Sequence, residues 1–391
     1  MIAGGGPAGM MLGLLLARAG LRATVLEKHA DFLRDFRGDT IHPSTLQVLH
    51  ELGLADDFLR LPHTKVRELG AAFGGRQFAL VDLGRIGARF PFIAMIPQWD
   101  FLDFLAGAAR AYRGFELRLQ TEATGLVFAG ERVAGVQTRG GPIAADLVVA
   151  ADGRHSTLRA AAGLEVIDLG APIDVLWFRI SRRQDDPAQA LVRLDPGSIV
   201  VMLDRGEYWQ CAFVIAKGAL DQVRARGLDA FRGTLARLMP FAAERMREIA
   251  SWDEVKLLTV QVNRLRTWYR EGLVCIGDAA HAMSPVGGVG INLAIQDAVA
   301  AANILWQGDL SPPALKALQE RREFPTRVTQ QFQVVVQERI LSRVLAGASD
   351  AAHPPLVLRL LSRFALLRRI PARIVGVGVR PEHVQSPAVT A

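Results

Sequence analysis

Short apolar runs alternate with glycine at the start of the chain. Residues 1–3 form an apolar stub, residues 4–9 read GGGPAG, and residues 10–19 are an apolar run that stops at Gly20. A second run at residues 21–26, LRATVL, follows directly. Glycine and proline interrupt regular structure, whereas a run of ten apolar residues is long enough for a buried helix. The order predicts a strand, a tight loop, a helix and a second strand.

Two later apolar runs also end in polar or glycine-rich loops. Residues 147–150 read LVVA and precede ADGRHS, and residues 272–276 read GLVCI and precede GDAAHAMSPVGGVGIN. Short continuous apolar runs bounded by turn residues are typical of buried strands. Residues 293–305 then predict an apolar helix. Three strand-to-loop units therefore recur, at the start, in the middle and late in the chain.

The pattern differs between the second and third of these units. The runs DVLWFRI, SIVVMLD and EYWQCAFVI are rich in β-branched and aromatic side chains, which predicts the strands of another sheet. We expect a discontinuous first domain of residues 1–66, 97–168 and 262–345. A substrate-binding sheet domain would comprise residues 67–96 and 169–261, and residues 346–391 would form a C-terminal helical segment.

Composition narrows the class of protein. The 391 residues are 50% hydrophobic, which suffices for a large core and a second domain. The net charge of +7 comes mostly from arginines scattered along the chain, with lysine at only five positions, so we do not expect nucleic acid as a partner. Cys211 and Cys275 are far apart in apolar surroundings and predict buried thiols, with no metal site. The uncharged first seventeen residues lack the basic segment of a targeting signal, so we expect a cytoplasmic protein.

The first loop has the spacing of a dinucleotide-binding loop. Gly4, Gly6 and Gly9 fit the GxGxxG pattern, in which the glycines allow a tight turn, a close approach to pyrophosphate and close helix packing. The helix N-terminus adds a partial positive charge of about +0.5. Glu27 ends the second strand, where a carboxylate accepts hydrogen bonds from a ribose diol.

Taken singly, the polar residues of the later loops have simpler explanations. Asp152 and Ser156 could be helix caps and Arg154 a solvated turn residue. Taken together, GGGPAG, ADGRHS and GDAAHAMSP in this order resemble the three fingerprints of the single-component flavin-dependent aromatic hydroxylases, the family of para-hydroxybenzoate hydroxylase. The resemblance extends from residue 1 to about residue 338.

This resemblance implies an α/β fold: a Rossmann-like FAD-binding domain of the para-hydroxybenzoate hydroxylase type, an inserted mainly-β substrate domain and C-terminal helices. It also implies FAD as cofactor and NADH or NADPH as co-substrate. The implied cofactor-binding residues are Gly4, Gly6 and Gly9 at the pyrophosphate, Glu27 at the adenosine ribose, Arg37 at the pyrophosphate, Gln98 at the ribityl chain, Asp152 and Gly153, Asp278, and Gly290, Ile291 and Asn292 through their main chain at the flavin ring.

The activity that the resemblance implies is hydroxylation of an aromatic or polyketide-like small molecule with O2, through a flavin C4a-hydroperoxide. Pro285 would place its carbonyl where the substrate meets the flavin. His42 and Asp39 are candidates for handling a proton, although each could cap a helix instead. His281 is expected to satisfy local backbone. Tyrosine is absent near residues 191–192, so para-hydroxybenzoate is not the expected substrate.

Several alternatives stay open at this level. An FAD-dependent oxidase, dehydrogenase or epoxidase would share these motifs, and so would a flavin-binding protein without catalysis. Residues 353–379 predict a basic amphipathic helix broken at Pro371. We expect its apolar face to pack on the first domain, and a membrane surface is the less favoured partner. The chain would act as a monomer or a homodimer.

Overall fold

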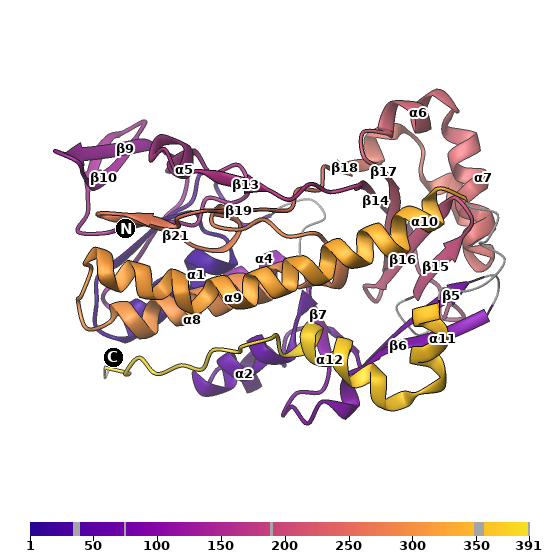
Figure 1. Cartoon of the computed structure of the whole chain (residues 1–391), viewed down its shortest axis with the longest axis horizontal. Coiled ribbons are helices and arrows are strands. Elements are labelled where there is room, and N and C mark those ends of the chain that lie inside the picture. Colours follow the sequence, from indigo (N-terminus) through magenta and orange to yellow (C-terminus); the bar gives the residue numbers. More distant parts are fainter. Residues whose placement is uncertain (34–39, 74–75, 188–190, 348–355, 390–391) are drawn as a thin grey trace.

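The computed structural model describes residues 1–33, 40–73, 76–187, 191–347 and 356–389 (Figure 1). Two sheets dominate the described residues, one of six strands and one of seven. The long helix α9 (Pro312–Val336) runs from the first sheet to the second along the length of the molecule (Figure 1).

The six-stranded sheet carries the three predicted strand-to-loop units. Its order is β20 (Tyr269–Arg270), β21 (Leu273–Cys275), β12 (Val148–Ala150), β1 (Ile2–Ala3), β2 (Ala23–Leu26) and β8 (Phe115–Arg118). All neighbours are parallel except β20 and β21. Ile2 lies opposite both Val149 and Val25, so β1 is central despite its length. Because parallel strands end at one edge, the loops after β1, β12 and β21 meet there.

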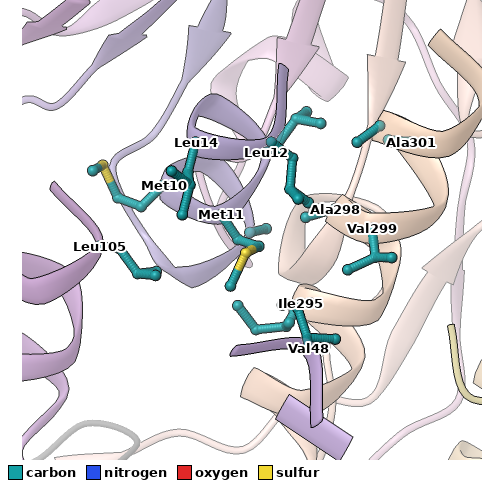
Figure 2. Close-up of a cluster of buried hydrophobic side chains, with 14 of the residues drawn as sticks. Met10, Met11, Leu12, Leu14, Val48, Leu105, Ile295, Ala298, Val299 and Ala301 are labelled. Atoms are coloured by element: carbon teal, nitrogen blue, oxygen red, sulfur yellow. The ribbon is translucent and has the colours of Figure 1, made fainter. Parts of the chain in front are cut away.

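Helices cover one face of this sheet. Helix α1 (Pro7–Arg18) packs on α8 (Gly290–Leu305), and α4 (Gln98–Ala109) packs against α1 (Figure 2). Met11 and Leu12 are fully buried in the core cluster that also holds Ala298 and Ala301 of α8. Such small residues let two helix axes approach closely. The predicted helix at 293–305 begins three residues earlier, because Gly290 already lies in the helix.

A three-stranded meander covers the other face. It consists of β9 (Ala123–Ala129), β10 (Arg132–Thr138) and β11 (Gly141–Ala144), and α5 (Thr157–Ala161) lies beside it. Val133 and Val136 of β10 share a buried cluster with Val148 and Ala150 of β12. The first sheet is therefore buried on both faces, as its continuous apolar runs predict.

The seven-stranded sheet combines two distant segments of sequence. Its order is β18 (Lys256–Leu258), β14 (Ile173–Ser181), β17 (Tyr208–Ala216), β16 (Ser198–Asp204), β15 (Leu191–Asp195), β5 (Glu68–Phe73) and β6 (Arg76–Asp82). Strands β14, β16 and β17 coincide with the three runs read from the sequence. Strands of the segments 67–96 and 169–261 thus share one sheet, whereas β7 (Ile93–Met95) pairs with β3 (Thr40–Ile41) and β4 (Thr64–Val66) instead. The domain boundaries themselves stay a prediction.

Different elements cover the two faces of the second sheet. On one face, Phe178, Trp209 and Phe213 pack on α7 (Leu228–Leu238) and the 3-10 helix Pro240–Glu248. On the other, Ile199 and Val214 pack on α10 (Ser342–Leu345), which follows α9 through a π-helical turn. The remaining helices are α2 (Pro43–Glu51), α3 (Ala55–Phe58) and α6 (Leu220–Ala225), and β13 (Val166–Asp168) pairs with β19 (Asn263–Leu265).

The C-terminal segment differs in detail from the expectation. Helices α11 (Leu356–Arg363) and α12 (Arg369–Gly376) are separated at Phe364, whose backbone is extended, so the predicted break at Pro371 is wrong. Pro371 is the third residue of α12, where its missing N–H has no partner to lose. Residues 377–389, the described part beyond α12, are not helical, and Val389 donates its N–H to the Arg18 carbonyl.

One helical stretch among the described residues, Val286–Leu305, is long and apolar enough to cross a membrane by length and composition. It is 72% buried inside the fold, as expected for the core helix α8. Cys211 and Cys275 are buried free thiols, as predicted, and burial raises the pKa of both.

Candidate functional site

The three glycines of the first loop have different surroundings. Gly4 has a φ of +113°, and a Cβ there would lie 2.2 Å from the Ala151 carbonyl oxygen. A Cβ on Gly9 would lie 2.0 Å from the Gly4 carbonyl oxygen. Gly6 is the N-cap of α1, and a Cβ there would meet no atom within 4 Å. Gly4 and Gly9 therefore permit close packing, and Gly6 leaves open space at the helix N-terminus.

Glu27 lies at the end of β2 and is 8% exposed. Its Oε2 accepts from the Gly5 N–H at 3.0 Å, and its Oε1 accepts from the His29 N–H at 3.0 Å. The carboxylate thus fixes the glycine loop from the neighbouring strand. Each carboxylate oxygen has two lone pairs, so Glu27 can still accept from a ligand hydroxyl.

The second loop follows β12 and is closed by its own side chains. Asp152 Oδ2 accepts from the Leu158 N–H at 3.2 Å, and its buried Oδ1 has no partner. Burial raises the pKa of Asp152, against an opposing hydrogen bond from Ser156. Gly153 has a φ of +87°, which favours glycine. An orphaned carboxylate oxygen is the kind of group that a ligand hydroxyl satisfies.

The third loop meets the second. Arg154 Nη2 lies 3.5 Å from Asp278 Oδ2, and Arg159 donates to the Ala279 carbonyl at 3.2 Å and to the Arg154 carbonyl at 2.6 Å. The Asp278 side chain is 31% exposed, so one side of the carboxylate faces outward. The structure therefore brings the loops that begin at Asp152 and Asp278 together. Arg159, for which no role was predicted, joins them.

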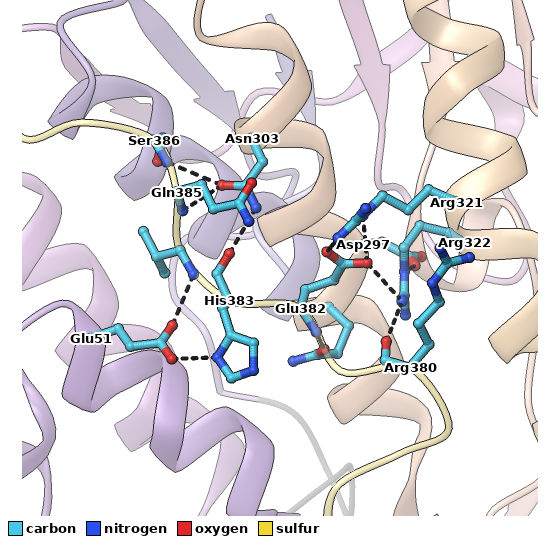
Figure 3. A network of polar contacts seen from close by, with 12 residues as sticks. Glu51, Asp297, Asn303, Arg321, Arg322, Arg380, Glu382, His383, Gln385 and Ser386 are labelled. Carbon is cyan, nitrogen blue, oxygen red and sulfur yellow. Dashed lines mark hydrogen bonds and ion pairs between the residues drawn. The ribbon is translucent and has the colours of Figure 1, made fainter.

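A buried ion-pair network contacts the third loop. Figure 3 shows its members Asp297, Arg321, Arg322 and Glu382. Asp297 of α8 accepts from the Gly277 N–H at 3.0 Å and from Arg322 Nε at 2.9 Å, and its Oδ2 lies 2.6 Å from His281 Nε2. His281 was expected to satisfy local backbone; its ring instead pairs with this carboxylate. Glu382 of the C-terminal tail lies 2.7 Å from Arg321 Nη2 and 3.5 Å from Arg322 Nη1. The tail thus belongs to the support of the site.

The glycine loop before α8 presents main chain rather than side chains. Gly287 and Gly288 have φ values of 80° and 64°. A Cβ on Gly288 would lie 2.8 Å from Thr40 Oγ1. Gly290, Ile291 and Asn292 form the first turn of α8, where helix N–H groups have no intrahelical acceptor. These are the groups predicted to contact the flavin ring.

The side chain of Asn292 has a structural task of its own. It is 2% exposed, and its Oδ1 accepts from Ser44 Oγ at 2.6 Å and from Thr45 Oγ1 at 2.9 Å. These bonds fasten α2 to the start of α8. The side-chain oxygen of Asn292 is thus used within the protein, and the main-chain role at the flavin ring stays a prediction.

His42 caps α2 next to the same glycine loop. It is fully buried, its Nδ1 lies 2.7 Å from the Val375 carbonyl oxygen, and its Nε2 has no hydrogen-bond partner. Burial lowers the pKa of His42 to about 4, against contacts to the Val375 and Gly288 carbonyls that raise it. The imidazole is therefore neutral near pH 7, with Nδ1 donating to Val375 and Nε2 left as an acceptor.

The remaining predicted residues are Arg37, Asp39, Gln98 and Pro285. Arg37 and Asp39 lie outside the described residues. Gln98 is the first residue of α4, and its role at the ribityl chain stays a prediction. Pro285 is half-buried, and Val286 separates it from the Gly287–Gly288 pair.

These residues fit a dinucleotide such as FAD. Gly6 leaves space at the N-terminus of α1, where pyrophosphate is favoured by unpaired N–H groups and the helix dipole. Glu27, Asp152 and Asp278 supply carboxylate oxygens for hydroxyls. The N-terminus of α8 supplies N–H groups for a ring edge that carries negative charge. Among the described residues, no group of three or more histidines, cysteines or carboxylates could hold a metal ion.

One face of the second sheet, which we call the wall, adjoins this loop at Leu203. Leu203 of β16 packs against the cluster that includes Met283, Val289 and Leu293. Gln210 lies opposite Leu203, and Trp177 lies opposite Ala212, two residues along β17 from Gln210. Side chains two residues apart share a face, so Trp177 and Gln210 face the same side as Leu203. The indole Nε1 of Trp177 is buried without a partner.

The sequence analysis did not single out these wall residues. Trp177 lies inside the run DVLWFRI, which predicted a strand, but no pattern within one strand tells which of its faces lines a site. Pairing with β16 and β17 settles that question.

Comparison with known proteins agrees with this geometry. Residues 1–331 match the family described as FAD binding domain. The chain is 32% identical over 390 residues to 6-methylpretetramide 4-monooxygenase of Streptomyces rimosus, an alignment that covers 95% of this chain and 91% of the relative. It is 28% identical over 314 residues to rifampicin monooxygenase of Streptomyces venezuelae, covering 78% of this chain and 63% of that protein.

Solved structures share the fold. PqsL of Pseudomonas aeruginosa in complex with 2-aminobenzoylacetate superposes with a TM-score of 0.76 at 21% identity, covering 88% of this chain and 97% of that one. The tetrameric form of 2-methyl-3-hydroxypyridine-5-carboxylic acid oxygenase gives a TM-score of 0.73 at 20% identity, covering 94% and 96%. These similarities confirm the predicted fold class.

Proposed function

Because this chain belongs to the FAD-binding domain family and is an FAD-dependent oxidoreductase of the monooxygenase type, we propose that its substrate is a polycyclic, polyketide-like aromatic ring system. The observation that carries the proposal is the wall of the second sheet beside the third loop. It is largely apolar, with Val201, Leu203 and Ala212, and it holds one unpaired donor, Trp177 Nε1. A flat apolar ring with a carbonyl or hydroxyl oxygen matches that surface.

When bound, FAD supplies hydride acceptance from NAD(P)H and oxygen transfer from O2. The residues of this chain would hold and orient it. Gly6 and the α1 N-terminus would bind the pyrophosphate, Glu27 the ribose, and Asp278 the ribityl or pyrophosphate side. The first turn of α8 would stabilise negative charge on the pyrimidine edge of the ring.

The apolar surroundings of the loop would exclude water. Met283, Val289 and Leu293 form a buried cluster with Ile93 and Val375 on the substrate-domain side. A site closed by such side chains keeps water from competing with the substrate. No side-chain nucleophile is needed for this chemistry.

His42 would act as a hydrogen-bond acceptor. A group with a pKa of about 4 carries little proton near pH 7, so it is poorly suited to deliver one. Its unpaired Nε2 could instead accept from a hydroxyl group near Gly288. Pro285 would present its carbonyl at the substrate side of the ring.

The test is an assay of the purified protein with FAD, NADH or NADPH and a set of tetracyclic and smaller aromatic polyketides. We expect substrate-dependent consumption of NAD(P)H and a hydroxylated product. Consumption with stoichiometric hydrogen peroxide and no hydroxylated product across the set would favour an oxidase. An oxidised product formed without O2 would favour a dehydrogenase, and an epoxide product an epoxidase.

We also propose that the enzyme works in the cytoplasm as a monomer or homodimer, with the C-terminal helices packed on the protein. Ala372 and Val375 of α12 are buried in the cluster around Met283. A membrane surface is the alternative partner, because Leu366 and Ile370 are 71% and 60% exposed among arginines. Sedimentation with anionic phospholipid vesicles distinguishes the two, and binding that requires Leu366 and Ile370 would overturn the cytoplasmic proposal.

A further inference from the structure

Helix α9 carries a buried polar stripe. Five polar side chains of this helix are at most 3% exposed: Arg322, Thr326, Thr329, Gln330 and Gln333. The inward face of a helix is normally apolar, and a buried amide without partners costs about 1–3 kcal/mol. The two buried glutamine amides should therefore have specific partners.

The partners of Gln330 and Gln333 are the main chain of the third loop. Gln333 Nε2 donates to the Ser284 carbonyl at 2.9 Å and to the Val286 carbonyl at 2.8 Å, and Gln333 Oε1 accepts from the Ser284 N–H at 3.1 Å. Gln330 Nε2 donates to the Ala282 carbonyl at 3.1 Å and to the Asn263 carbonyl at 2.8 Å. The amide of Gln333 thus uses both N–H donors and its oxygen on the two neighbours of Pro285.

This stretch of loop has hydrogen bonds of its own, from the Gly288 N–H to the Pro285 carbonyl at 3.0 Å and from the Val286 N–H to Ser284 Oγ at 3.3 Å. It leads from Ser284 into a 3-10 turn, Val286–Gly288, in which Gly287 and Gly288 have positive φ. Glycine residues can adopt many backbone conformations, so a loop that contains them needs hydrogen bonds from outside to stay in one of them. The three bonds from Gln333 fix the peptide units on both sides of Pro285.

We propose that Gln333 is a positioning residue. It would hold the Pro285 carbonyl and the Gly287–Gly288 main chain in the position that contact with the flavin ring and the substrate requires. The kinetic readout of this inference rests on the proposed function, because the role of the Pro285 carbonyl beside the flavin is part of that function. Its structural readout is independent, since a shifted loop changes the surroundings of bound flavin whether or not a substrate turns over.

The test compares Gln333→Met with Gln319→Met in the full chain. Methionine keeps length and removes every hydrogen bond of the amide. Gln319 is a matched control on the same helix: its Oε1 accepts from the Trp268 N–H at 2.9 Å and its Nε2 donates to the Arg266 carbonyl at 2.9 Å, away from the loop. FAD content, melting temperature, the absorbance spectrum of bound flavin, kcat and KM are measured for both.

We expect both variants to bind FAD and to have a lower melting temperature than the wild type. Only Gln333→Met should shift the flavin spectrum and lower kcat, roughly ten- to a hundredfold, with KM for NAD(P)H within about twofold of wild type. Gln333→Glu, which keeps the acceptor for Ser284 and loses both donors, should show the same shift and serves if the methionine variant does not fold.

Two results would overturn the proposal. One is a spectrum and kcat for Gln333→Met that equal those of Gln319→Met. The other is loss of FAD from both Gln333 variants while Gln319→Met retains it, which would make Gln333 a requirement for folding of the site. If the wild-type protein turns over no substrate, the spectral comparison still decides about Gln333, and only the proposed function fails.

Discussion

Arg154 Nη2 lies 3.5 Å from Asp278 Oδ2, although the two residues are 124 positions apart in the chain. The contact joins the loop after β12 to the loop after β21, neighbouring parallel strands. Arg159 adds two bonds to main-chain carbonyls of the same two loops. The polar edge of the site is thus one connected unit built from distant segments.

Asp278→Ala should lose FAD while the chain stays folded. The carboxylate is 31% exposed and its ion pair with Arg154 is long, so its removal costs little stability. Its expected partner is the cofactor. FAD per chain after gel filtration and the far-ultraviolet spectrum check this, with Asp278→Asn as the variant that keeps size. Stoichiometric FAD in the alanine variant would contradict the assignment.

Gly6→Ala and Gly9→Ala should fail in different ways. A Cβ on Gly6 meets no protein atom, so this variant should fold with an unchanged apo melting temperature and bind FAD about tenfold or more weakly. A Cβ on Gly9 would collide with the Gly4 carbonyl, so that variant should be unstable even without FAD. Thermal melts with and without added FAD separate the two effects. Equal FAD affinity in Gly6→Ala and wild type would show that the pyrophosphate lies elsewhere.

The local pattern predicted the first loop, because the spacing of Gly4, Gly6 and Gly9 is itself a local signal, although the close approach of Gly4 to Ala151 joins distant segments. The strands β1, β2, β12 and β21 and the helices α1 and α8 were found for the same reason: apolar runs and glycine stops are local signals. The order of the strands in the sheet was not predicted, because it depends on pairing between distant segments, such as Ile2 with Val149.

Asp186 should contribute acid sensitivity. Its carboxylate pairs with Arg245, with both side chains 3% exposed. Burial opposes ionisation, but hydrogen bonds from Arg245, the Arg183 N–H and Trp209 prevail and lower the pKa of Asp186 from 3.8 to about 2. A depressed carboxyl pKa stabilises the fold above the unfolded pKa, and this contribution disappears as pH falls from about 4 to about 2. It amounts to about 2 kcal/mol.

Asp186→Asn checks this assignment. The free energy of unfolding should be lower for the variant near neutral pH, and the difference from wild type should narrow by about 2 kcal/mol as pH falls from about 5 to about 2. Denaturant titrations at several pH values measure it. A difference that does not change with pH would show that Asp186 keeps its ordinary pKa in the folded protein.

Glu382→Ala should destabilise the protein through the C-terminal tail. Glu382 is buried against Arg321 and Arg322, so its removal breaks two ion pairs, although Arg322 keeps its pair with Asp297. The expected cost is about 1–3 kcal/mol. Glu165→Ala is the control, because its pair with Arg266 is exposed on both sides and should matter little. Melting temperatures of the two variants compare a buried with an exposed pair. Similar melting temperatures would mean that the tail does not support the fold.

Trp177→Phe should raise KM for the aromatic substrate roughly three- to tenfold with little change in kcat, because it removes one hydrogen-bond donor from the wall. Trp268→Phe is the control: its indole Nε1 is also buried without a partner, but its ring lies against His281 in the first domain. Steady-state kinetics with one hydroxylated substrate measures both. An unchanged KM in Trp177→Phe would remove this residue from the substrate wall.

The parts of the site that the sequence did not predict depend on contacts between distant segments. Nothing in the sequence around Trp177 or Gln333 shows which distant segment either side chain faces. Their contacts form only when the second sheet and α9 pack beside the third loop. The pairing of His281 with Asp297, sixteen positions apart, was missed for the same reason, since α8 must first fold back onto β21.

The most direct test of the account is turnover of an aromatic polyketide by the FAD-loaded protein with NAD(P)H and isotopically labelled O2, followed by mass spectrometry of the product. The account predicts a hydroxylated product that carries one labelled oxygen atom for each NAD(P)H consumed. An oxidised product without labelled oxygen, or labelled hydrogen peroxide with the substrate unchanged, would contradict it.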